Sequence, residues 1–136
     1  MQLPSLARVV VRCAVVASIA GLVPAQSQWT TDAVVPKARA VHAAAFDLVN
    51  NTAVMFGGYA NAGALGETWL WSPFGGWVEA VTPVGPSRRA EHAMAYDLVR
   101  GEVVLFGGTD GTTTFGDTWI WNGITWRNAW ASREKT

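Results

Sequence analysis

Short apolar segments separated by glycine-rich or polar turns make up the chain from about residue 42 onward. Within residues 42–49, alternate side chains would point to opposite faces of a strand, and neither set is polar enough to meet water along its length. Residues 52–56 and 102–106 are also largely apolar on both faces. Runs of this length and composition predict β-strands that lie between neighbouring sheets.

The pattern occurs twice, and the second copy follows the first after 50 residues. The shift places residues 36–49 on 86–99, residues 54–58 on 104–108 and residues 66–71 on 116–121, with about half of the aligned positions identical. Each copy reads Pro-x-x-Arg-x-x-His-Ala, then apolar-Phe-Gly-Gly, then acid-Thr-Trp-x-Trp. A repeat of about this length is typical of arrays of supersecondary units.

Each copy predicts four antiparallel strands. The first strand ends in a hairpin turn where Asn50 and Asn51 suit the positive φ angles of a type I′ turn, and Arg100 and Gly101 stand there in the second copy. Two glycines follow each second strand and predict positive φ or a close backbone approach. The strands are expected at residues 42–49, 52–56, 67–71 and 77–81 in the first copy, with the later three recurring at 102–106, 117–121 and 126–130.

Tryptophan is unusually abundant, with eight residues beside fourteen glycines. Trp69 and Trp71 lie two positions apart and so share a strand face, as do Trp119 and Trp121. Such rings bury a large apolar area between sheets, and an aromatic platform for sugars is the alternative. Because aromatic residues at strand spacing are usually core residues, we expect these rings to pack between sheets.

The order of these motifs resembles the bacterial kelch repeat, as found in galactose oxidase-like and other secreted kelch proteins. The resemblance covers about residues 36–126. It implies an all-β fold of two four-stranded antiparallel kelch-type β-propeller blades, at residues 36–85 and 86–130, with one extra N-terminal strand at residues 28–35. It also implies binding through loops, but no single activity, because propellers carry many unrelated functions.

Two blades make an incomplete propeller, since closed propellers typically have four to eight. Each end blade would expose an apolar face larger than soluble monomers normally show. The chain is therefore expected to be either the first part of a longer propeller or one share of a homo-oligomeric ring. In a closed ring the strand at residues 28–35 would complete the last blade.

The N-terminal segment, residues 1–25, is expected to be a signal peptide rather than part of the fold. Arg8 and Arg12 form a positive region, and residues 13–23 form an apolar run too short to span a bilayer. Small residues favour cleavage after Ala25, with cleavage after Ser27 nearly as suitable, and a retained membrane anchor is the alternative. The sequence thus predicts a secreted or periplasmic protein that meets the membrane only through this transient segment.

Ten basic and ten acidic residues give zero formal net charge, and the basic residues do not cluster. A surface that binds nucleic acid is usually basic, so nucleic acid is not an expected partner. Half of the residues are apolar, which excludes a disordered or solvating chain.

Candidate metal-binding and acid–base residues are few. His42 and His92 hold equivalent positions, but a metal would need a third ligand and Asp47 points to the opposite strand face. Hydrogen-bonded structural histidines are therefore favoured. Asp47 and Asp97 precede the hairpin turns and are expected to bind turn backbone rather than to act as general acids.

No catalytic residue, cofactor or metal is predicted. Glu67 and Asp117 stand at the start of the third strands and are expected to accept hydrogen bonds from the loop backbone. A catalytic pair of these carboxylates is possible, but no other residue supports it. No serine, threonine or lysine stands in a nucleophile motif. A copper site like that of galactose oxidase would need a cysteine, and Cys13 lies in the segment that is expected to be removed.

In an antiparallel four-stranded blade, the loops after the second and fourth strands emerge on one side, and tight turns lie on the other. Loops on a rigid scaffold carry most binding residues, although ordinary solvated loops are the alternative. The candidate ligand-binding residues on this side are Arg39, Tyr59, Asn61, Arg88, Arg89, Asp110 and Thr112.

The function that these features favour is that of an exported kelch-repeat binding or interaction module without catalysis of its own. Its ligand would be a protein or a carbohydrate. One alternative is a part of a periplasmic carbohydrate-active propeller enzyme. The other is a truncated fragment of a longer kelch protein without independent function.

Overall fold

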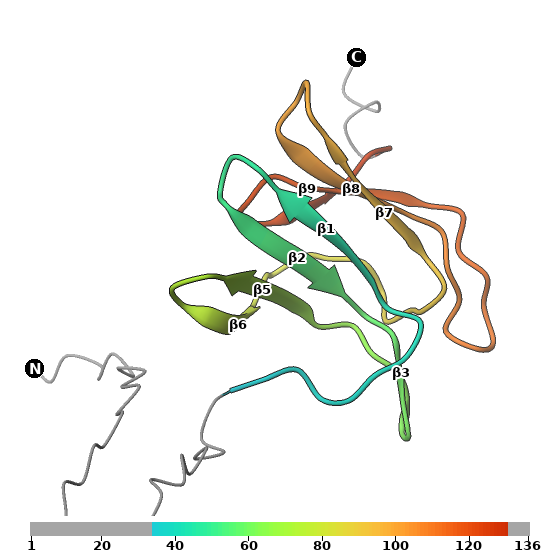
Figure 1. Cartoon of the computed structure of the whole chain (residues 1–136). Coiled ribbons are helices and arrows are strands. Elements are labelled where there is room, and N and C mark those ends of the chain that lie inside the picture. Colours follow the sequence, from blue (N-terminus) through green and yellow to red (C-terminus); the bar gives the residue numbers. More distant parts are fainter. Residues whose placement is uncertain (1–33, 131–136) are drawn as a thin grey trace, which may run out of the picture. The chain divides into compact units, whose positions relative to one another are not determined.

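The computed structural model describes residues 34–130, which fold into two four-stranded antiparallel sheets and contain no helix (Figure 1). No helix in this part of the chain is long and apolar enough to cross a membrane. The sheets do not close into a ring, as an incomplete propeller predicts. The predicted signal peptide and residues 28–33 of the predicted extra strand lie outside the described residues, and Val34 and Val35 are not in a strand.

The first blade has the strand order β1-β2-β5-β6, and the second has the corresponding order β7-β8-β9-β10. A two-stranded hairpin, β3-β4, interrupts the first blade between β2 and β5. The strands are β1 (Ala43–Asp47), β2 (Thr52–Phe56), β3 (Tyr59–Ala60), β4 (Gly63–Ala64), β5 (Thr68–Ser72), β6 (Gly76–Ala80), β7 (Ala93–Asp97), β8 (Glu102–Phe106), β9 (Thr118–Trp121) and β10 (Trp126–Asn128).

The prediction of four strands per repeat is thus confirmed, with some strands shorter than expected. The registers of the two blades correspond: Val54 pairs with Leu70 in the first blade as Val104 pairs with Ile120 in the second. Equivalent residues therefore occupy equivalent places in the two sheets.

The predicted type I′ hairpin turn is wrong. Asp47 pairs with Thr52 across the end of the hairpin, so residues 48–51 form a four-residue loop, and within it only Asn51 has a positive φ, of 52°. The Asp47 carboxylate accepts the N–H groups of Val49 and Asn50 at 3.0 and 3.1 Å. The carboxylate bonds favour the longer loop over the two-residue turn, because they satisfy backbone donors inside it.

Asp97 does the same in the second blade, where its carboxylate accepts the N–H groups of Val99 and Arg100 at 2.9 and 3.0 Å. The prediction that these aspartates bind turn backbone is therefore confirmed.

The hydrophobic core lies between the blades. Val54 and Phe56 of β2 pack against Val103 and Leu105 of β8, and all four side chains are fully buried or nearly so. The other core residues are Trp121 and Trp126, with Ala45, Leu70, Ala80, Met94, Tyr96 and Trp119 packed against them. A blade alone could not bury these side chains, so the two repeats fold as one unit.

The four paired tryptophans differ in burial. Trp121 is 1% exposed and Trp119 packs against the same core, as expected. In the first blade Trp69 and Trp71 share the face of the sheet that looks away from the second blade, where Trp69 is buried and Trp71 is 37% exposed. The prediction of core tryptophans therefore holds between the blades and not for Trp71.

The glycine pair after β2 allows the second blade to approach the first. Gly57 has φ +60°, and a Cβ atom there would lie 2.2 Å from the carbonyl oxygen of Arg89. No side chain fits this distance, so the prediction of positive φ and close backbone approach is confirmed.

We expect Gly57→Ala to lower the free energy of unfolding by about 2–3 kcal/mol, because it adds a steric clash to the strain of positive φ. Chemical denaturation followed by tryptophan fluorescence measures the change. The matched control is Gly76→Ala, at φ +66° with no atom within 4 Å of the added Cβ, for which we expect about 1 kcal/mol. Equal losses in the two variants would contradict the account.

Candidate functional site

A buried arginine joins three segments at the loop end of each blade. In the first blade, Arg39 donates to the carbonyl oxygen of Gly57 at 3.1 Å and to the Glu67 carboxylate at 2.7 Å. Its Nε donates to the carbonyl oxygen of Lys37 at 3.0 Å, and its side chain is only 3% exposed. We call this arrangement the arginine latch.

The second blade repeats the latch with Arg89, whose side chain is fully buried. Arg89 donates to the carbonyl oxygen of Gly107 at 3.0 Å and makes a bidentate ion pair with Asp117. Its guanidinium group also lies 4.1 Å from the centre of the Phe115 ring. Planar guanidinium groups suit such sites because they combine bidentate pairing with stacking.

The latch acids also bind the tryptophans of the third strands. The Trp119 indole N–H donates to Asp117 at 2.7 Å, and the Trp69 indole N–H lies 3.4 Å from Glu67. The hydrogen bonds from Arg89 above all, and that from Trp119, lower the pKa of Asp117, which therefore stays ionised. The arginine, the first glycine, the acid and the first tryptophan of the repeated motif thus form one hydrogen-bonded unit.

The latch accounts for two of the seven predicted ligand-binding residues. Arg39 and Arg89 lie at the predicted end of the blades, but their guanidinium groups are buried and bound to protein acceptors. A ligand could reach them only by displacing these partners. In this structure they hold the ends of the strands from which the loops begin.

The other five predicted residues are exposed or half-buried. They belong to the β3–β4 hairpin, the segment before β7 and the loop after β8, which lie at the end of the blades opposite the β1–β2 and β7–β8 turns (Figure 1). Asn61 is exposed at the turn between β3 and β4. Tyr59 reaches the loop of the second blade, since its hydroxyl oxygen would be 3.2 Å from a Cβ atom on Gly111. Arg88 is exposed on the segment that joins the blades.

The loop after β8 is organised by Asp110. Its carboxylate accepts the N–H groups of Thr113 and Thr112 at 2.7 and 2.9 Å and the Thr112 hydroxyl at 2.8 Å. These hydrogen bonds, with a smaller contribution from the charge of Arg88, lower the pKa of Asp110 to about 2. The loop therefore presents a permanent negative charge near a positive one.

We define the loop surface as Tyr59, Asn61, Arg88, Asp110 and Thr112. Both blades and the segment between them contribute to it, and the structure brings Tyr59 close to the Asp110 loop and Arg88 within electrostatic reach of Asp110. It combines an aromatic ring, an amide, a hydroxyl and both signs of charge.

The two histidines are not equivalent in burial. His42 is exposed, whereas His92 is 7% exposed and packs edge-on against Phe56 with ring centres 5.6 Å apart. Among residues 34–130, neither ring nitrogen of His92 has a hydrogen-bond partner of normal geometry, so the expected hydrogen-bonded histidine is wrong at this position. Burial is the largest cause that lowers the pKa of His92 to about 4, and the charges of Arg89 and His42 lower it further. Interaction with the Phe56 backbone partly offsets this shift.

Within residues 34–130, no three His, Cys, Asp or Glu side chains are grouped so that they could hold a metal ion. A cavity of about 190 Å³ lies near the loop end, and the residues that line it include Thr68, Glu79 and Trp126. It is smaller than the usual site for a small molecule, which is roughly 300–1,000 Å³.

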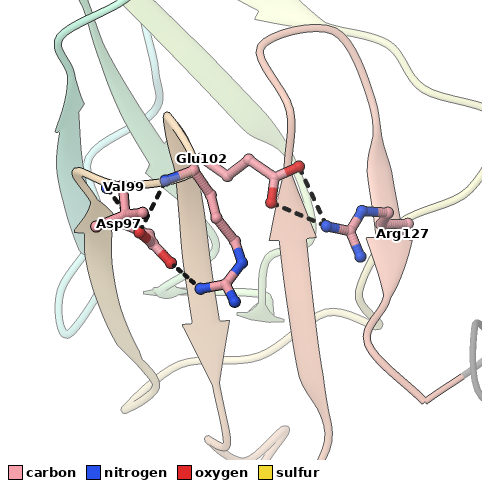
Figure 2. A network of polar contacts seen from close by, with 5 residues as sticks. Asp97, Val99, Glu102 and Arg127 are labelled. Atoms are coloured by element: carbon pink, nitrogen blue, oxygen red, sulfur yellow. Dashed lines mark hydrogen bonds and ion pairs between the residues drawn. The ribbon is translucent and has the colours of Figure 1, made fainter.

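A second polar network lies away from the loop surface, on the second blade (Figure 2). It consists of Asp97, which binds Arg100 at 2.9 Å, and of Glu102, which binds Arg127 at 2.8 Å. The first pair is largely exposed at the turn, so it contributes little to stability.

Sequence reasoning did not assign a function to Phe115 or recognise that Glu67 and Asp117 bind the two arginines. The repeat contained a signal, because an arginine and an acid recur 28 residues apart in both copies. Comparison with known protein families and with characterised proteins finds no match for the chain. The likeness to kelch repeats therefore rests on the motifs of the chain itself.

The arginine latch leads to a test of stability. We expect Asp117→Asn to lower the free energy of unfolding by about 3 kcal/mol, because it leaves the buried Arg89 guanidinium without a compensating charge. Urea denaturation measures the change. The matched control is Asp110→Asn, which should cost clearly less, since it leaves no buried charge unpaired and the asparagine can still accept the loop N–H groups. A tolerated Asp117→Asn would refute the structural role of the latch.

The lowered pKa of His92 predicts that the stability of the fold depends on pH. The unfolded chain binds a proton at this histidine below its ordinary pKa of 6.5, while the folded chain does so only near pH 4. The free energy of unfolding should therefore fall by roughly 2–3 kcal/mol as pH drops from 6.5 to 4, with no contribution from His92 above that window.

His92→Gln should flatten this slope, measured as the urea midpoint against pH. The control His42→Gln should leave the slope unchanged, because His42 is exposed. Aspartates with lowered pKa act at lower pH, so they do not produce the same signal.

Proposed function

We propose that the chain is an exported binding or interaction module of the kelch type, without catalysis of its own, which holds its ligand at the loop surface. The observation that carries the proposal is that loops from both blades and the segment between them bring Tyr59, Arg88 and Asp110 together over a rigid base. Loops positioned by a rigid scaffold are where binding residues are most often found.

The latches supply the rigidity. Each of them fixes the start of a blade, the end of its second strand and the start of its third strand through one buried side chain. Backbone pairing adds to this, since Ala40 bridges to Tyr59 and Ala90 to Thr109. The loop surface therefore begins from ordered backbone, which reduces the entropy lost when a ligand binds.

The chemistry of the surface favours a polar ligand of extended shape. Tyr59 offers an aromatic face with a hydroxyl group that makes no hydrogen bond to the described residues, and Asn61 and Thr112 offer further donors and acceptors. The small cavity nearby does not favour a deeply enclosed small molecule. A carbohydrate chain or a segment of another protein suits this surface.

The absence of catalysis is supported by what the acids do. Glu67 and Asp117 are held in ion pairs with the latch arginines. The lowered pKa of Asp117 makes it a poor proton donor near neutral pH. Asp110 also stays ionised and is occupied by the N–H groups of its own loop. Export rests on the N-terminal residues 1–25, which have the pattern of a signal peptide.

An array of immobilised oligosaccharides and peptides tests the proposal. We expect the chain to be retained by at least one of these classes, and Tyr59→Ala and Arg88→Ala each to reduce the affinity about tenfold or more, because each removes a contact group from the loop surface.

The matched control is Arg100→Ala, which removes an equally exposed arginine from the opposite, turn end of the second blade. It should leave the affinity unchanged. Retention that responds equally to Arg88→Ala and Arg100→Ala would point to non-specific charge effects, and no retention by either class would argue against the proposal.

A further inference from the structure

The interface between the two blades is built from unlike faces. The first blade contributes Phe56 and Thr68, and the second contributes Trp121 and Trp126. The Trp126 indole N–H donates to the Thr68 hydroxyl at 2.8 Å, and the Phe56 ring meets the Trp126 ring edge-on at 5.7 Å. Three backbone bonds complete the contact: Gly58 N–H donates to the Arg89 oxygen at 2.9 Å, Arg89 N–H to the Leu65 oxygen at 3.0 Å and Glu91 N–H to the Val41 oxygen at 3.0 Å.

The repeat places a second set of the same residues on the outer faces. The outer face of the second blade carries Phe106 and Thr118, which correspond to Phe56 and Thr68. The outer face of the first blade carries Trp71 and Trp77, which pair with each other as Trp121 and Trp126 do.

The residues on the outer faces are more exposed than their equivalents between the blades, as expected for faces without a neighbouring blade. Phe56 is 1% exposed and Phe106 is 55% exposed, while Trp121 is 1% exposed and Trp71 is 37% exposed. An exposed phenylalanine and tryptophan at opposite ends of the unit are costly to keep in contact with water.

The backbone atoms that would form the same contact are also without partners. In the described part of the chain, Gly108 N–H and the carbonyl oxygen of Arg39 make no hydrogen bond, whereas their equivalents Gly58 and Arg89 bond to each other. The equivalents of the second backbone bond, Arg39 N–H and the Phe115 oxygen, are likewise unpaired among these residues.

Gly107 fits the same pattern. It has φ +71°, and a Cβ atom there would meet only the Phe115 oxygen, at 3.5 Å. At the equivalent Gly57, the added Cβ would lie 2.2 Å from the carbonyl oxygen of the following blade's arginine. Space beside Gly107 is thus open for the Arg39 carbonyl of a neighbour.

We infer that the outer face of the second blade binds the outer face of the first blade of another copy of this chain, repeating the contact inside each copy. In this arrangement Phe106 packs against Trp77, the Trp77 indole N–H donates to Thr118, and Gly108 N–H donates to the Arg39 oxygen. The occupant is a second copy because each face of the chain is complementary to its other face, and not to itself.

Each outer face also carries charged side chains on its outermost strand. The outermost strand of the second blade places Arg127, paired with Glu102, on the outer face (Figure 2). The outermost strand of the first blade places Glu79 on the opposite outer face, in register with Trp69.

A contact between unlike faces is heterologous, so it continues until the ring closes. Propellers close with four to eight blades, so two, three or four copies of the two blades described here would complete a ring. The inference concerns the ends of the unit and does not depend on which ligand the loop surface takes.

Native mass spectrometry and sedimentation of the full chain test the inference. We expect one discrete species of two, three or four copies. Phe106→Asp and Trp71→Asp each remove one face, so each variant alone should be monomeric. An equimolar mixture should form a one-to-one dimer, because one intact face of each kind remains, and non-specific aggregation would not show this complementation.

The variant Gly107→Ala tests the same interface with a smaller change, in case an aspartate variant fails to fold. The added methyl group would meet the Arg39 oxygen of the neighbouring copy, so association should weaken at least tenfold, while Gly76→Ala should leave it unchanged. A monomeric wild-type chain, or variants that remain associated when separate, would overturn the inference. A monomer that associates only after residues 1–33 are removed would also overturn it, since those residues would then cover the face.

Discussion

The buried arginine of each blade is the interaction on which the rest of the structure depends. A guanidinium group that is fully removed from water is stable only if its donors are satisfied, and Arg89 meets this condition with two carbonyl oxygens and the Asp117 carboxylate. To bring these acceptors together, the chain must end one strand just before Gly107 and begin another just after Asp117. One side chain thus sets the positions of three segments.

The same constraint positions the contact between the blades. Because Arg89 is held in its latch, its own backbone N–H and carbonyl groups are presented to the first blade, where they bond to Leu65 and Gly58. The glycine at position 57 then becomes necessary, since any side chain would meet the Arg89 oxygen. Polar interactions therefore set the spacing of the blades, and the apolar side chains of the core fill the space between them.

The latch also decides which residues are available for binding. The most strongly repeated polar residues of the motif are used inside the protein, so they cannot also recognise a ligand without being displaced. Residues that differ between the repeats lie at or near the surface. Tyr59, for example, aligns with Thr109 of the second repeat, and Asn61 aligns with Gly111. The scaffold is repeated and the loop surface is specific to this chain, which is the usual division between framework and binding site.

The sequence by itself determined the two repeats, the four strands in each, the positive φ of the glycine pairs and the role of Asp47 and Asp97 in the turns. These features depend on side-chain periodicity and on residues close together in the chain. The tertiary structure alone decided that Arg39 and Arg89 are buried and that His92 is buried while His42 is exposed. Burial depends on what packs against a residue from a distant segment, and equivalent residues of a repeat differ when only one has a neighbouring blade.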